Sequence, residues 1–240
     1  MTLALGEAEV GALVAATARV TGLVLTAPVL GDGGFSARAK LVAVIVIGGV
    51  IGLARPAVMY DQLPATTLLE LGVGALTGAS ARFVLARVAV AGQLVGLALG
   101  LGFAQQYDPR ASESAGTIRA LATALSSLAF VSAGGLAAIV RGAAAPAHVV
   151  DLAALSSHVV ADAIAAFGRG VAIAAPVLLA GIVGNLGVAV MSRAAPGVNV
   201  HSFAMVGVLV LGGLVILWSA PGFAGSSLDT AREAIERLLG

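Results

Sequence analysis

Long apolar stretches without a single charged residue recur along this 240-residue chain and limit its fold more than any other feature. Val88 to Tyr107, Ala120 to Val140 and Val171 to Ser192 each have the length, about 20 residues, that a helix needs to cross a bilayer. The chain is 59% hydrophobic and 10% charged, whereas an average soluble domain carries about 25% charged residues. These stretches and this composition exclude a soluble enzyme domain.

Further apolar segments bring the expected number of membrane-crossing helices to six or seven. The number depends on whether Pro64 to Tyr107 forms one interrupted hairpin or two spans. No segment alternates apolar and polar residues as barrel strands do, so all of them are expected to be helices. The predicted fold class is an all-α, polytopic membrane protein with six to seven glycine-rich hydrophobic helices. The additional segments are Val10 to Leu30, Leu41 to Ala54 (stopped or kinked by Arg55-Pro56), Pro64 to Ala81 and Val198 to Phe223.

The positions of the basic residues favour an orientation with the N-terminus outside the cell. In the seven-span arrangement most of them fall on the cytoplasmic side, as the positive-inside tendency requires. Glu7 and Glu9 stand where a signal peptide would be basic, so the first apolar segment is expected to be retained. The cytoplasmic set is Arg38, Lys40, Arg82, Arg87, Arg141, Arg169, Arg232 and Arg237, and the opposite set is Arg55, Arg110, Arg119 and Arg193.

Glycines four residues apart mark helix faces that are expected to pack closely. Gly92, Gly96 and Gly100 line one side of a helix, and similar clusters lie at 48–52, 72–78 and 181–187. Small residues at this spacing let helix backbones approach each other in membranes. Because 32 glycines cost backbone entropy on folding, we expect a subunit packed among other helices rather than one bathed in lipid.

Two charged residues, Arg19 and Glu70, lie inside apolar segments. Ionised groups there are costly and usually face a partner or a cavity. The favoured interpretation is a structural ion pair between helices, or snorkelling near a helix end. An ion or substrate pathway is the alternative.

No enzymatic, metal or cofactor site is expected. The chain has no cysteine, and it has no nucleophile elbow, phosphate loop or carboxylate pair with acid–base spacing. His148, Asp151, His158 and Asp162 would share one helix face, but they extend over roughly 21 Å and cannot bind one ion. Only His158 with Asp162 remains as a metal-binding pair, and a wetted polar face is favoured over it. A net charge of +1 gives no electrostatic reason to bind nucleic acid.

Residues 225–240 are expected to form a short cytosolic amphipathic tail after a membrane domain of residues 1–224. Thr230 and Glu233 have the spacing of a capping box, and Glu233 and Arg237 that of an i, i+4 ion pair. Docking of the tail on a partner and docking on its own chain are equally compatible with its apolar stripe. This stripe comprises Ala231, Ala234, Ile235, Leu238 and Leu239.

The stretch GFAQQYDPRASESAG, residues 102–116, carries a glycine-rich apolar helix into a small polar loop. Residues before a proline leave the helical conformation, so the helix is expected to stop at Asp108-Pro109. An ordinary solvent loop and a mobile constriction in a pore are both compatible with this pattern. The residues that would form the constriction are Phe103, Gln105, Gln106, Tyr107, Asp108, Pro109, Ser112 and Ser114.

Several blocks occur in an order that is hard to obtain by chance. They are Arg19 followed by TAPVLG with Pro28, Glu70 ahead of Gly72 and Gly74, AGQLVGLALGLGFAQQYDP at 91–109, Pro176 with Asn185 and Gly187, and SRAAPGVNV with Arg193, Pro196 and Asn199. Together they resemble the FliR/SctT family of flagellar and injectisome export-gate proteins, over roughly residues 10 to 220. Gly134-Gly135 departs from the Gly-His pair common in the family, so no role of that histidine carries over.

The resemblance implies a non-enzymatic subunit of the flagellar type III export gate, in the bacterial inner membrane at the flagellar basal body. Such subunits assemble with P- and Q-type membrane subunits into a helical complex around a pore. A cytoplasmic gate protein and the export ATPase complex act below it, and unfolded secretion substrates pass through. By similarity, residues 103–116 would be a plug that closes the pore.

Three alternatives remain. Within the family, the chain could be the T component of an injectisome. Outside it, a stand-alone small-molecule permease has only Glu70 and the Arg55-Pro56 break in its favour. A structural anchor is disfavoured because it would need one span rather than six.

Overall fold

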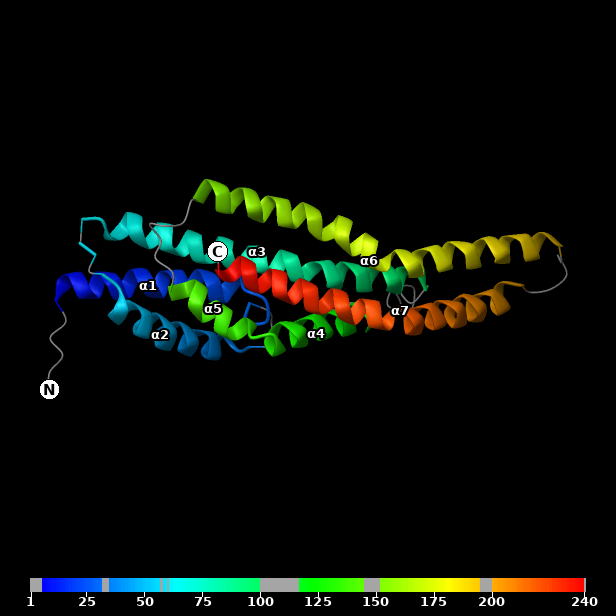
Figure 1. Ribbon diagram of the computed structural model, residues 1–240, viewed down its shortest axis with the longest axis horizontal. Coiled ribbons are helices and arrows are strands. Elements are labelled where there is room, and N and C mark those ends of the chain that lie inside the picture. Colours follow the sequence, from blue (N-terminus) through cyan, green and yellow to red (C-terminus); the bar gives the residue numbers. More distant parts are fainter. Residues whose placement is uncertain are drawn as a thin grey trace. The chain divides into compact units, whose positions relative to one another are not determined.

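The computed structural model describes residues 6–31, 35–56, 58–59, 61–99, 117–144, 152–194 and 200–239. Within these ranges every regular element is an α-helix (Figure 1), which confirms the predicted all-α class. The helices are α1 (Glu7–Thr26), α2 (Ala37–Ala54), α3 (Leu63–Ala98), α4 (Thr117–Ser132), α5 (Gly135–Ala144), α6 (Leu152–Ala194) and α7 (Val200–Leu239).

Local sequence signals set the ends of α2. The Ser36 side chain accepts a hydrogen bond from the Ala39 amide at 3.2 Å and so caps the first turn. At the other end, Arg55 adopts an extended backbone before Pro56, and the helix stops at Ala54 as predicted.

Four helices within the described residues are long and apolar enough to cross a membrane: α1, α2, α3 and α6. The bent pair α4–α5 raises the number to five if the pair forms one span. The expectation that Pro64 to Tyr107 forms one interrupted hairpin or two spans is wrong over the described part of this segment, because α3 runs unbroken from Leu63 to Ala98. Arg82 and Arg87, which the positive-inside tendency places on the cytoplasmic side, lie within α3, and the residues between them include no helix breaker.

The segment from Ala120 to Val140 is also not one straight span. It forms α4 and α5, which meet at an angle of 64°. Gly134 lies at the break with a φ of 90°, a conformation that residues with a Cβ atom rarely adopt. The Gly134 amide donates to the Val131 carbonyl at 3.1 Å and closes the last turn before the bend.

The predicted capping box at Thr230 is wrong, because α7 continues from Val200 through Pro221 to Leu239. Within this helix the Thr230 hydroxyl donates to the Ser226 carbonyl at 2.5 Å, one turn back, so it does not start a new helix. The boundary expected at residue 224 thus falls inside α7. Ala231, Ala234 and Leu238 of the apolar stripe are buried, and the backbone of Leu238 lies against Gly142 of α5. In this structure the stripe docks on its own chain.

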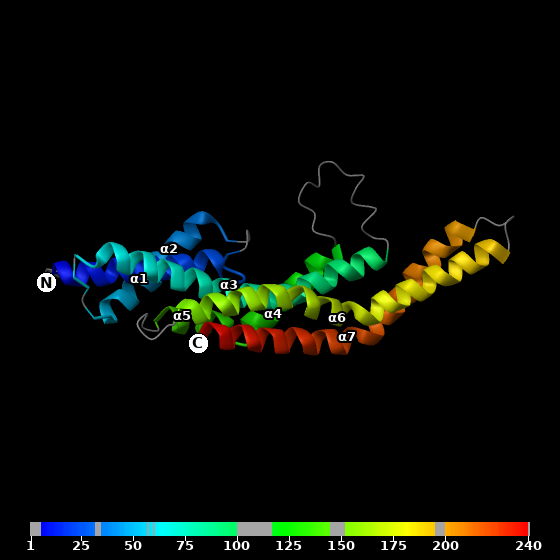
Figure 2. The same cartoon turned by 90° about the horizontal axis from the view of Figure 1, so that it is seen from above.

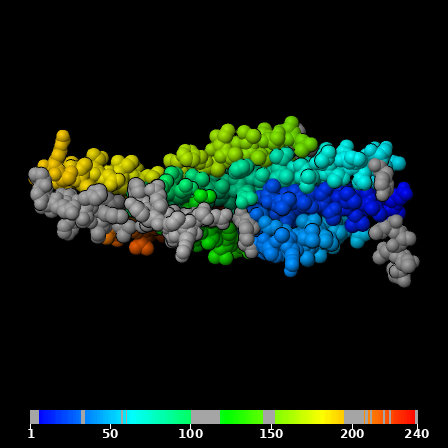
Figure 3. All heavy atoms as spheres, turned by 180° about the vertical axis from the view of Figure 1, so that it is seen from behind, coloured from blue at the N-terminus to red at the C-terminus, as the bar shows by residue number. Residues whose placement is uncertain are grey.

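The chain divides into two compact units, to both of which α3, α4, α6 and α7 contribute. The first unit comprises Met1–Leu85, Phe130–Ile164 and Ala231–Gly240. Within it α1 and α2 lie side by side (Figures 1 and 2), and α5 contacts both of them. The outer face of α2 lies at the surface (Figure 3) and carries exposed apolar side chains. These are Leu41, Val42, Ile45, Val46, Val50 and Leu53.

The second unit comprises Ala86–Ala129 and Ala165–Thr230. Its core joins Ala91, Val95 and Leu99 to Ala174 and Val177 of α6. Ile118 of α4 and Val215 and Ile216 of α7 pack around this centre.

Candidate functional site

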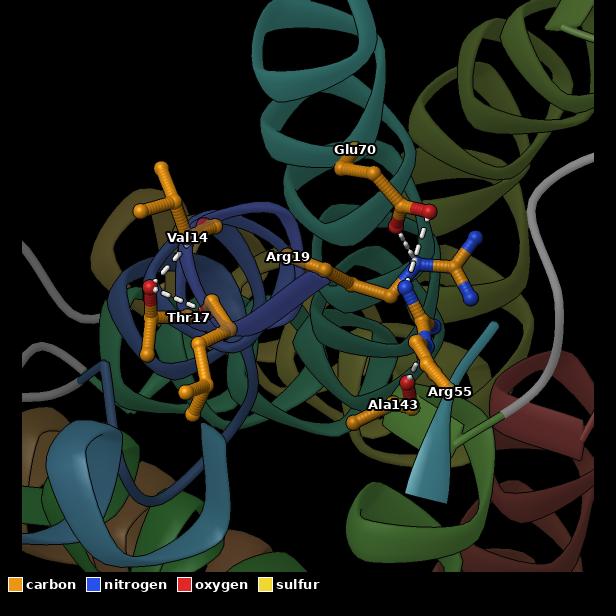
Figure 4. Close-up of polar contacts among 7 residues, drawn as sticks. Val14, Thr17, Arg19, Arg55, Glu70 and Ala143 are labelled. Carbon is orange, nitrogen blue, oxygen red and sulfur yellow. Dashed lines mark hydrogen bonds and ion pairs between the residues drawn. The ribbon is translucent and has the colours of Figure 1, made fainter. Parts of the chain in front are cut away.

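Arg19 and Glu70 form an ion pair that joins α1 to α3 (Figure 4). The Nε atom of Arg19 lies 2.7 Å from Oε2 of Glu70, and the two side chains are only 1% and 6% exposed. This is the structural ion pair between helices that the two isolated charges predict.

Arg55 is a third member of the cluster, and its pairing with Glu70 is not predicted from the sequence. Its Nη1 atom donates to Oε1 of Glu70 at 2.8 Å, and its Nη2 atom donates to the carbonyl of Ala143 at 3.0 Å. Figure 4 shows Arg19 and Arg55 converging on the one carboxylate. Because Pro56 ends α2, the backbone of Arg55 leaves the helix and its side chain reaches α3 and α5. A residue at a helix end follows no periodicity, so only the folded structure reveals this role.

The charge cluster Arg19–Glu70–Arg55 fixes four parts of the first unit relative to one another. Each oxygen of the Glu70 carboxylate binds a different guanidinium, and Arg55 also satisfies a carbonyl in the last turn of α5. A buried pair of this kind adds little net stability over an apolar substitute, whereas removing one member leaves an uncompensated charge. The arrangement therefore holds the register of α1, α3, α5 and the end of α2.

Beside this cluster the backbones of α1 and α3 touch. A Cβ atom added at Gly74 would meet the carbonyl of Arg19 and would lie 3.1 Å from the Leu23 amide nitrogen. On the same helix an added Cβ at Gly72 would meet nothing within 4 Å. Of the two glycines that follow Glu70, only Gly74 thus makes the close approach.

A second charge cluster in the same unit consists of Asp162 of α6, Ser80 of α3 and Arg237 of α7. The Ser80 hydroxyl donates to Oδ2 of Asp162 at 2.6 Å, and Nη2 of Arg237 donates to Oδ1 at 3.2 Å. The Nε atom of Arg237 lies 3.2 Å from Oδ2, so the guanidinium grips both oxygens. The Asp162 side chain is 3% exposed and that of Arg237 34%.

This geometry overturns the metal pair considered for His158 and Asp162. Both carboxylate oxygens of Asp162 are engaged by Ser80 and Arg237. Across the part of the chain that the structure describes, no group of three or more metal-ligating side chains gathers.

The remaining residues singled out in the sequence lie apart from both clusters. Gly92 faces α4, where an added Cβ would lie 2.6 Å from Cβ of Ala122, and Gly96 is in ordinary contact distance of Ile118. Pro28 is buried just after α1, whereas Pro176, Asn185 and Arg193 are exposed on α6. The described residues do not include Gly100, Pro196, Asn199 or the eight plug candidates: Phe103, Gln105, Gln106, Tyr107, Asp108, Pro109, Ser112 and Ser114.

Helices of this length and apolarity, pinned by buried ion pairs, define an all-α polytopic membrane protein. Residues 10–234 match the family described as bacterial export proteins, family 1, and the chain belongs to this family. The match confirms the resemblance that the sequence blocks indicate.

Two relatives carry the same name. The chain is 28% identical to the flagellar biosynthetic protein FliR of Caulobacter vibrioides over 242 aligned residues, which cover 91% of this chain and 92% of that protein. It is 29% identical to the flagellar biosynthetic protein FliR of Aquifex aeolicus over 160 residues, which cover 64% of this chain and 62% of that protein.

Proposed function

We propose that this protein is a subunit of the flagellar type III protein export gate in the bacterial inner membrane, at the flagellar basal body. The observation that carries the proposal is the likeness to the Caulobacter flagellar protein along nine-tenths of both chains. The family match over residues 10–234 supports the export role itself.

The partners that we propose are the P- and Q-type membrane subunits of the gate, together with the cytoplasmic gate protein and its export ATPase complex. Apolar side chains along α6 are exposed in this structure. This exposure supports contact with further helices or lipid, because such contact would remove the side chains from water. These side chains are Leu179, Ile182, Val183, Leu186 and Val190. Unfolded flagellar proteins would pass through the pore of the assembled gate, and the subunit itself would have no enzymatic activity.

Deleting the gene is expected to abolish filament assembly and the secretion of hook-type substrates, because a gate without this subunit has no continuous pore. Motility in soft agar and immunoblots of the culture medium measure both effects. A plasmid copy of the wild-type gene should restore them, while growth and other membrane functions stay normal. Normal motility of the deletion strain would contradict the proposal. Normal motility with lost effector secretion would instead support the injectisome alternative.

Co-purification separates the export gate from a stand-alone permease. A gate subunit should elute with its P- and Q-type partners in mild detergent. A permease should be monodisperse and stable without them.

We also propose that residues 103–116 close the pore as a plug. The support is the resemblance of this segment to the family's loop and its small, polar composition after a glycine-rich helix. Replacing Asp108 to Gly116 by a short Gly-Ser linker should make the assembled gate leaky to small solutes, which dye efflux from cells would measure. The matched control places the same kind of linker at residues 32–34 and should leave the cells tight. Unchanged permeability of the first variant would argue against a plug.

A further inference from the structure

The last turn of α5 is held from two sides by the two charge clusters. Arg55, which is anchored on Glu70, donates to the carbonyl of Ala143 at 3.0 Å. At the preceding residue, Gly142, the backbone of Leu238 comes so close that an added Cβ would lie 3.2 Å from the Leu238 carbonyl carbon. Gly142 and Ala143 are thus the point at which both clusters act on one helix.

The second hold depends on the Asp162 cluster. Arg237 immediately precedes Leu238, and its guanidinium grips both oxygens of the buried Asp162 carboxylate. Ser80 fixes the same carboxylate from α3. The position of Leu238 against α5 is therefore set by an ion pair on α6 and α7 that shares no residue with the Glu70 cluster.

The opposite end of α5 is a bend that only glycine accommodates easily. Gly134 has a φ of 90°, and an added Cβ there would meet nothing within 4 Å. The next residue, Gly135, lies against the buried ring of Phe130. Because glycine adopts positive and negative φ with similar ease and Gly134 has open space around it, Gly134 is the residue of this bend at which the backbone can rotate.

Apolar packing holds α5 only weakly between these ends. Its buried residues are Gly135, Ala138, Ile139 and Ala143, and Ile139 alone among them has a large side chain. Leu136, Val140 and Arg141 are exposed. Small buried surfaces contribute little, since hydrophobic stabilisation scales with the apolar area removed from water.

We propose that α5 is a hinged arm, closed in this structure by two independent charge clamps and free to swing about Gly134 when they open. The two clamps differ in how far their side chains are exposed to solvent. The side chains of Arg55 and Glu70 are 12% and 6% exposed, whereas that of Arg237 is 34% exposed and open to competition by salt or by another charged group. The Arg237 clamp opens first.

Spin labels on the full-length protein test this arm directly. The chain has no cysteine, so cysteines introduced at Val140 of α5 and at Leu69 of α3, both exposed and in one unit, would be the only labelled sites. Pulsed electron paramagnetic resonance on the purified chain in nanodiscs should give one narrow peak of label-to-label distances for the labelled parent, which carries no clamp substitution. Arg55→Ala and Arg237→Ala should each increase severalfold the fraction of molecules outside that peak. In the double variant the increase in this fraction should exceed the sum of the increases in the two single variants, because either clamp alone still restrains the arm.

Arg141→Ala is the matched control, since it removes an exposed arginine from α5 itself. Its distance peak should equal that of the parent. An unchanged peak in both clamp variants, or equal broadening in the control, would overturn the proposal. Should Arg55→Ala fail to fold, Arg237→Lys provides a second test. Lysine keeps the positive charge but lacks the guanidinium that binds both carboxylate oxygens of Asp162. A smaller broadening in this variant supports the arm, and an unchanged peak overturns it.

Discussion

Glu70→Ala is expected to lower the free energy of unfolding by about 3 to 5 kcal/mol, because it leaves two buried guanidinium groups around an empty site. Arg19 is 1% exposed and cannot reach water without moving α1. Such a loss is a large part of the about 5 to 15 kcal/mol that stabilises a typical domain. Thermal unfolding of the detergent-purified chain and its steady-state amount in membranes would measure the effect.

Glu236→Ala provides the matched control for this variant, since Glu236 is an exposed carboxylate on α7. Its removal should change the free energy of unfolding by no more than about 0.5 kcal/mol. If Glu70→Ala melts like this control, the cluster does not hold the helices together.

Gly74→Ala is expected to destabilise the protein by about 3 kcal/mol, because the new methyl group would collide with backbone rather than with a movable side chain. The obstructing atoms belong to Arg19 and Leu23 of α1. The collision would also pull Arg19 away from Glu70, so the variant should lose helix packing and the ion pair together. Chemical unfolding in mild detergent would measure the change.

Gly72→Ala, two residues earlier on the same helix, should have the opposite sign. A Cβ atom added at Gly72 meets nothing within 4 Å, and alanine in a helix is favoured over glycine by roughly 0.5 to 1 kcal/mol. Equal effects of the two substitutions would show that α1 and α3 do not touch at Gly74.

Local patterns predict much of this fold because a helix is mainly a local structure. The end of α2 at Ala54 follows from Arg55-Pro56 alone. The errors arise where a local signal has two meanings. The pair Arg82 and Arg87 indicates a loop in a membrane protein, yet the same residues continue α3 without interruption. Thr230 and Glu233 have the spacing of a capping box, but they lie in the interior of α7, which begins at Val200.

The charge clusters were predicted only in part, since their members are far apart in the chain. Arg19 and Glu70 stand out because each interrupts an apolar segment, so their pairing could be expected. Ser80 and Arg237 lie 82 and 75 positions from Asp162, and nothing in a periodicity relates them. Only the arrangement of α3, α6 and α7 brings these groups together.

The Arg19–Glu70 pair has a consequence for the order of synthesis. The ribosome makes α1, with its arginine, well before the glutamate of α3 emerges. An arginine at the centre of an inserting helix costs about 2.5 to 3.5 kcal/mol during translocon-mediated insertion. Until α3 arrives, α1 carries this cost alone, so its stable integration into the bilayer waits for a helix that is translated two helices later.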